Sequence, residues 1–135
     1  MGMHFTATST GRAYCSAEIS LSYKLIAGTA KGAYSLLNIY LSLYNSAHTA
    51  ELDSVCIFAD DAVCTTGGQY DETSGTDYVD EYVQWDYTLQ SGSTYYAVVK
   101  VYLRTFNGGY VYSSTGTRQS PTTMSADVAE ISVYT

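Results

Sequence analysis

The sequence predicts an all-β protein, a single sandwich of seven or eight antiparallel strands over residues 1–135. Three observations support this prediction. Apolar and polar residues alternate with a period of two along most of the chain, which is the period of a half-buried strand. Segments rich in glycine, asparagine and serine separate these alternating stretches, as turns do. No segment has a convincing helical period, so we expect one all-β domain.

Three strands are expected in the first half of the chain. Residues 13–25 alternate strictly, so one face should be buried and the other solvated. A turn bracketed by two glycines leads to residues 34–44, which carry aromatic side chains on the outward face as well as leucines on the inward face. A turn at 45–48 then leads to a shorter strand at 52–59. The outer face of the second strand is therefore expected to be apolar.

The second half begins with residues 60–76, which are acidic and polar without periodicity, so we expect an irregular acidic loop there. Four further strands are expected, over 77–89, 95–104, 110–117 and 129–133. Trp85 falls on the inward side of the first of these. Asn107-Gly108 favours a hairpin turn, because both central positions of such a turn need positive φ.

The segment from Leu89 to Val99 resembles the turn between the fifth and sixth strands of fibronectin type III and related immunoglobulin-like domains. A leucine, a glycine, a tyrosine and a valine keep the family spacing. The resemblance implies an immunoglobulin-like (fibronectin type III-like) sandwich in which the hydroxyl of Tyr95 bonds to the backbone at the corner. The chain departs from the family at Ser91, where proline is usual, and at Trp85, which lies beside the corner. The chain is also similar to small secreted bacterial domains of unknown function.

The composition excludes some partners and indicates a compartment. A net charge of -7 and a pI near 4.4 disfavour nucleic acid and anionic lipid surfaces as partners. No apolar run is long enough for a membrane helix, so we expect no membrane insertion. Only 14% of the residues are charged, which is typical of secreted β proteins with hydroxyl-rich surfaces. We expect a secreted or cell-surface protein whose leader has been removed.

The three cysteines lead to two expectations. Cys56 and Cys64 flank a segment that we expect to turn over at Asp60-Asp61, so the two thiols should reach bridging distance and form a disulfide. The alternative is a pair of reduced, buried thiols. Cys15 falls on the inward face of its strand and should be an unpaired core thiol.

Tyrosine is the most informative residue type, with fifteen in the chain. If the strands at 34–44, 95–103 and 110–117 share a sheet, as the resemblance implies, their outward side chains converge on one face. The expected binding face consists of Tyr34, Tyr40, Tyr44, Tyr96, Tyr102, Tyr110 and Tyr112. An amphipathic patch of this size favours contact with protein, including a second copy of the chain. The alternative is cross-strand aromatic pairing that only stabilises the sheet.

Ten of the thirteen carboxylates lie between Gly32 and Val99, a stretch without lysine or arginine. Calcium prefers such oxygen ligands, and the weak candidates are Asp60, Asp61, Asp77 and Asp80. The alternative is a solvated face that keeps a tyrosine-rich protein soluble. We expect no other cofactor and no zinc site, because the cysteine spacing matches no zinc motif.

The sequence holds no recognisable catalytic motif. His4 lies near the terminus and His48 in a turn, and a Cys-His pair that uses His48 is the only nucleophilic arrangement we can draw. We therefore expect no enzyme. The sequence predicts a secreted, non-enzymatic adhesion, assembly or structural module that contacts protein through its tyrosines. The alternative is a small glycan-binding domain, assisted by calcium through the acidic tract at 60–86.

Overall fold

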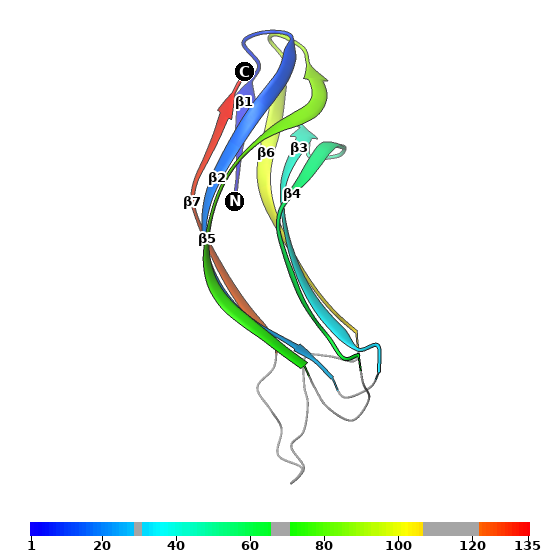
Figure 1. Ribbon diagram of the computed structural model, residues 1–135. Coiled ribbons are helices and arrows are strands. Elements are labelled where there is room, and N and C mark those ends of the chain that lie inside the picture. Colours follow the sequence, from blue (N-terminus) through cyan, green and yellow to red (C-terminus); the bar gives the residue numbers. More distant parts are fainter. Residues whose placement is uncertain (29–30, 66–70, 107–121) are drawn as a thin grey trace.

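The computed structural model describes residues 1–28, 31–65, 71–106 and 122–135, and these form an all-β sandwich (Figure 1). Seven strands and no helix are present in these ranges. The strands are β1 Gly2–Thr6, β2 Gly11–Ala27, β3 Tyr34–Asn45, β4 Glu51–Val63, β5 Asp71–Leu89, β6 Thr94–Phe106 and β7 Thr123–Tyr134. The prediction of a single all-β sandwich of antiparallel strands is confirmed. No helix that could cross a membrane is found in the described part of the chain.

The strands form two antiparallel sheets that face each other as long curved layers (Figure 1). Sheet A has the order β1-β6-β3-β4, and sheet B has the order β5-β2-β7. The two central strands of the core, β2 and β3, follow one another in the chain but belong to different sheets. Their connection therefore passes from one layer to the other, as in other sandwiches.

The core lies between the inner faces of the two sheets, and the alternation of the sequence explains which side chains enter it. Inward residues of β2 and β3 are almost completely buried, namely Cys15, Ala17, Ile19, Leu21, Leu37, Ile39, Leu41 and Leu43. Their outward neighbours are partly or fully exposed for the most part. The period of two predicted these faces correctly because each strand has one side against the opposite sheet.

Two aromatic residues, Trp85 and Tyr95, stabilise the packing at one end of the sandwich. Trp85 of β5 is fully buried, stacks on Phe5 at 6.4 Å between ring centroids, and donates its indole N–H to the carbonyl of Leu41 at 3.2 Å. The hydroxyl of Tyr95 accepts a hydrogen bond from the backbone N–H of Gln90 at 2.9 Å. This bond is the one that the resemblance implied for Tyr95.

The predicted Cys56–Cys64 disulfide is wrong. Residues 60 and 61 form no turn, because β4 continues through them and pairs them with Leu37 and Leu36 of β3. Eight residues of extended strand span roughly 26 Å, far beyond the Cα separation of about 7 Å that a disulfide tolerates. Cys56 is exposed and Cys64 is buried, and no disulfide joins them.

The third cysteine, Cys15, lies on the inward face of β2, as the alternation predicted. Its side chain is fully buried in the core, and burial raises the pKa of its thiol to about 12. Since the thiolate is the reactive form of cysteine, Cys15 behaves as a small apolar core residue.

Several strand boundaries differ from the prediction. We expected irregular chain over 60–76, but β4 runs to Val63 and β5 begins at Asp71, with residues 66–70 outside the described ranges. The beginning of β5 is polar, and it is held as a strand by pairing with the end of β2, from Asp71 opposite Ala27 onward. Strand β1 was not predicted. The strand expected at 110–117 lies outside the described residues.

Candidate functional site

The outer face of sheet A brings together most of the tyrosines that the sequence analysis selected. Backbone pairing sets Tyr44 opposite Tyr96 and Asn38 opposite Tyr102, and the odd-numbered neighbours of these residues on β3 are buried in the core. Opposed residues of paired strands point to the same side of the sheet. We call the resulting surface the tyrosine face, which consists of Tyr34, Tyr40, Tyr44, Tyr96 and Tyr102. The other two candidates, Tyr110 and Tyr112, lie outside the described residues.

The tyrosine face is closely packed along its length. Tyr34 stacks on Phe106 at 5.7 Å between ring centroids, and Phe106 is 55% exposed. Tyr102 is 51% exposed, whereas the other four tyrosines of the face are half-buried by their neighbours. Leu36 and Val98 fill positions between the rings. The face is therefore a continuous amphipathic surface, and not a set of isolated rings.

One ion pair lies on this face, and its charges are satisfied internally. The ammonium of Lys100 lies 2.6 Å from a carboxylate oxygen of Glu51 and donates to the hydroxyl of Tyr44 at 3.0 Å. That hydroxyl donates in turn to Glu51 at 2.8 Å. The bonds from Lys100 and then Tyr44 lower the pKa of Glu51, and the bond to Glu51 raises the pKa of Lys100.

These shifts predict a pH dependence of stability. Glu51 has a folded-state pKa below its ordinary 4.5, so its contribution is present above pH 4.5 and is lost as the pH falls through the lowered value. Lys100 contributes below its ordinary pKa of 10.5 and loses this contribution as the pH rises through the raised value. Both side chains are more than one third exposed, so solvent screening limits the effect to about 1 kcal/mol or less.

The variant Lys100→Met should therefore lose less stability than the unsubstituted protein when the pH falls from 6 to 3, as measured by thermal unfolding. The control is Lys24→Met. Because the ammonium of Lys24 lies 3.9 Å from Glu72, its removal should change the loss of stability between pH 6 and pH 3 less. Equal acid sensitivity in the protein and in Lys100→Met would contradict this assignment.

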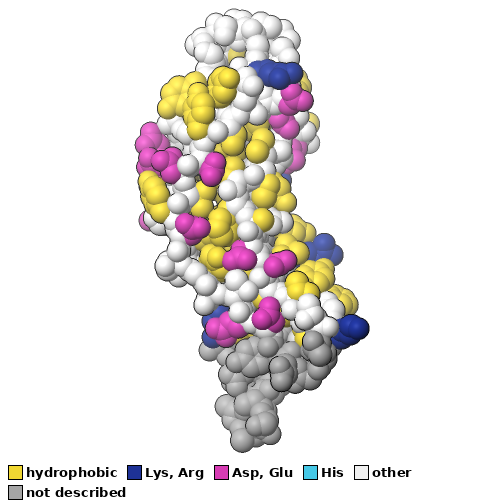
Figure 2. Space-filling model, viewed as in Figure 1, with side chains coloured by type: hydrophobic (Ala, Val, Ile, Leu, Met, Phe, Trp, Pro, Cys, Tyr) yellow, Lys and Arg dark blue, Asp and Glu magenta, His cyan; other side chains and the backbone are white. Residues whose placement is uncertain are grey.

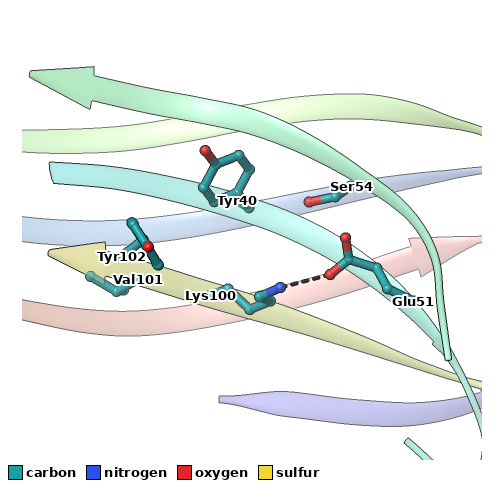
Figure 3. A pocket seen from close by; sticks show the side chains of 6 residues that line it. All are labelled: Tyr40, Glu51, Ser54, Lys100, Val101 and Tyr102. Carbon is teal, nitrogen blue, oxygen red and sulfur yellow. Dashed lines mark hydrogen bonds and ion pairs between the residues drawn. The ribbon is translucent and has the colours of Figure 1, made fainter. Parts of the chain in front are cut away.

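A shallow hollow of about 330 Å³ opens beside the ion pair (Figure 3). Its lining consists of Tyr40, Glu51, Ser54, Lys100, Val101 and Tyr102. Figure 3 shows the two tyrosines on adjacent strands toward one end and the Lys100–Glu51 pair toward the other. The hydroxyl of Ser54 lies 2.8 Å from that of Ser42, whose side chain is fully buried. The hollow thus offers two aromatic rings together with hydroxyl, carboxylate and ammonium groups.

The far end of the tyrosine face is covered by both histidines of the chain. His4 lies opposite Tyr96 in the β1–β6 pairing, and His48 comes from the turn between β3 and β4. The His48 ring stacks on the Tyr96 ring with 3.8 Å between ring centroids, and the centroid of the His4 ring lies 4.8 Å from that of Tyr96. The Tyr96 ring also covers Gly2, where a Cβ would come within 2.2 Å of the tyrosine oxygen. The contact between the two histidines was not expected from the sequence, because no strand was predicted at residues 2–6.

The outer face of sheet B carries a second group of tyrosines, which were not predicted to lie together. Tyr14 and Tyr82 stack at 5.0 Å, and Tyr134 lies 5.9 Å from Tyr82 between ring centroids. The strands at 13–25 and 77–89 both place tyrosines outward, so this cluster could have been found from the alternation and a correct pairing of those strands.

The outer face of sheet B is strongly acidic beside these rings. Asp80 lies opposite Glu18, and Glu18 lies opposite Glu130, so three carboxylates form a row across the sheet. Like charges directly opposite one another repel. The face of sheet B therefore has an uncompensated negative charge that the tyrosine face lacks.

The four calcium candidates do not form one cluster, although Asp60 and Asp77 both lie near the hydroxyl of Tyr23. Asp60 accepts the hydroxyl of Tyr23 at 2.5 Å, and this bond, together with burial and the charges of Asp60 and Asp77, raises the pKa of Tyr23 to about 12. Asp61 lies on the outer face of sheet A, and Asp80 lies on the outer face of sheet B. Figure 2 shows acidic side chains dispersed along the visible surface. Within the described ranges, no group of three or more His, Cys, Asp or Glu side chains is placed to hold a metal ion.

His48, the histidine considered for a Cys-His pair, lies in the turn between β3 and β4, whereas the exposed Cys56 lies within β4. His48 packs against Tyr96 and His4, whereas Cys56 lies opposite Tyr40, and its thiol donates to the carbonyl of Phe58 at 3.3 Å. Among the described residues, His48 and Cys56 therefore have different hydrogen-bond partners.

Comparison with known proteins adds no assignment: no family model, curated protein or solved structure matches this chain.

Proposed function

We propose that this chain is a secreted or cell-surface module that acts in adhesion, assembly or structure by binding protein through the tyrosine face, without enzymatic activity. The observation that supports this function best is the gathering of five tyrosines on one side of sheet A around a neutralised ion pair. Tyrosine supplies large amphipathic contact area at a low cost in side-chain entropy, and aromatic residues are enriched in the centres of interfaces.

Charge favours sheet A over sheet B as the contact surface between two copies. The described outer face of sheet A carries Lys100 and Arg104 together with Glu51 and Asp61, so its formal charges balance. The acidic row on sheet B would place like charges against each other in a symmetric dimer, which disfavours association. A second copy of this chain is therefore the partner that fits the tyrosine face with the fewest further requirements.

This function predicts that the purified protein self-associates and that Tyr40→Ser combined with Tyr102→Ser yields a monomer by light scattering. The two rings border the hollow and Tyr102 is half-exposed, so their loss removes contact area with little effect on the core. The matched control is Tyr78→Ser with Tyr82→Ser on sheet B, which should keep the native mass. A monomeric unsubstituted protein, or an unchanged mass in the first double variant, would refute self-assembly.

A glycan is the second candidate ligand, and the hollow of Figure 3 is the observation that favours it. Tyr40 and Tyr102 could stack on a sugar ring while Ser54, Glu51 and Lys100 bind its hydroxyls. In this case the protein is a monomer that binds oligosaccharides, and Tyr102→Ser alone abolishes that binding. If calcium assists, addition of a chelator lowers the melting temperature.

We also infer that the sandwich is immunoglobulin-like. The bond from the Gln90 N–H to the Tyr95 hydroxyl supports this assignment, and so does the central position of β2 and β3 in opposite sheets. In contrast to the usual order, the first strand lies beside β6 and the last beside β2.

A further inference from the structure

The only two histidines of the chain form a pair whose ligand atoms face each other. The Nε2 atoms of His4 and His48 lie 2.9 Å apart. The carbonyl oxygen of Ser46 lies 3.4 Å from the Nε2 atom of His4. Two imidazole nitrogens, which commonly ligate transition metals, therefore face each other, and a carbonyl oxygen lies within 3.4 Å of one of them.

The backbone and the neighbouring rings hold this pair in place. His48 has φ of 59°, a left-handed conformation that residues other than glycine adopt rarely and that clusters at functional sites. The side-chain oxygen of Asn45 accepts the N–H groups of Thr49 at 2.8 Å and Ala50 at 3.1 Å, which fixes the turn that carries His48. Both imidazole rings lie against Tyr96. The two rings are thus oriented before any ligand arrives.

We propose that His4 and His48 bind a divalent copper or nickel ion through their Nε2 atoms. Metal–nitrogen bonds of about 2.0–2.1 Å at a right angle place the two nitrogens about 2.9 Å apart, which is the separation in this structure. Copper(II) and nickel(II) prefer such a tetragonal arrangement of nitrogen and oxygen ligands. The carbonyl oxygen of Ser46 and water complete the coordination.

The proton between the two rings must move for the ion to bind. Without metal, one Nε2 carries a hydrogen and donates it to the other Nε2. When the ion binds, that ring loses its Nε2 proton to solvent and takes one up at Nδ1, so both rings stay neutral and both Nε2 lone pairs face the metal. The charge of the ion is favoured by the net charge of -7 of the chain.

Titration with copper(II) tests this site, with Cys56→Ser as the starting protein so that the exposed thiol cannot take up the metal. We expect saturable binding of one ion per chain, a higher melting temperature, and an electron paramagnetic resonance spectrum with two coordinated imidazoles. The variants are His48→Asn, since asparagine tolerates the left-handed backbone, and His4→Phe, which keeps a ring against Tyr96. Each should weaken binding about tenfold or more, because each removes a ligand.

The control is Asp61→Asn, a carboxylate on the same outer face, which should bind copper as tightly as the starting protein. Four results would overturn the site. The first is unchanged affinity in His48→Asn, which would show that His4 and its neighbouring backbone suffice. The second is a spectrum with one imidazole or none. The third is the absence of saturable binding in the starting protein, and the fourth is the loss of binding in Asp61→Asn.

Discussion

Trp85→Ala is expected to cost about 3–5 kcal/mol of unfolding free energy, which is a large share of the roughly 5–15 kcal/mol that a domain of this size possesses. The side chain is fully buried, stacks on Phe5, and donates to the carbonyl of Leu41 in the opposite sheet. Its removal leaves a cavity between the sheets and takes away the hydrogen bond to the carbonyl of Leu41. Urea denaturation followed by circular dichroism measures the loss.

The variant Trp85→Phe separates the two contributions to this loss. Phenylalanine keeps a ring against Phe5 but cannot donate to Leu41, so this variant should lose about 1–3 kcal/mol for the missing hydrogen bond, in addition to a smaller loss of volume. If Trp85→Ala lowered stability by less than about 1 kcal/mol, Trp85 would not join the two sheets as described.

The second large effect is expected for Tyr95→Phe. The Tyr95 side chain is only 6% exposed, and its hydroxyl accepts the N–H of Gln90 at the β5–β6 corner. Removal of the oxygen leaves that donor without its partner and should cost about 1–3 kcal/mol. The matched control is Tyr82→Phe, whose ring is 58% exposed and whose change should stay within about 0.5 kcal/mol. Equal effects of the two variants would contradict a structural role for the corner bond.

The fold could be predicted where alternation and burial agree. Strands β2 and β3 have one face against the opposite sheet, so the period of two identified their inward residues correctly. The first residues of β5 were not predicted to form a strand, because they are polar and show no alternation of apolar residues. They are held in the strand by backbone pairing with β2. The disulfide prediction failed for a related reason, since Asp60 and Asp61 are typical turn residues but here lie within β4.

The candidate site could be predicted in part. Alternation along each strand predicts which tyrosines of β3 and β6 point outward. These tyrosines share one face only if the two strands are neighbours, which is what the resemblance implied. The Lys100–Glu51 pair depends on a register across three strands that no local pattern encodes. The contact of His4 with His48 requires both β1 and the left-handed turn conformation of His48, neither of which the sequence displayed.

Footprinting of tyrosine side chains by hydroxyl radicals, at low and high protein concentration, tests the tyrosine face most directly. It reports which rings become covered when molecules associate. The proposed function predicts that Tyr40 and Tyr102 become protected at high concentration while Tyr78 and Tyr82 on sheet B remain reactive. Protection of the sheet B tyrosines instead, or equal reactivity of all four at both concentrations, would contradict it.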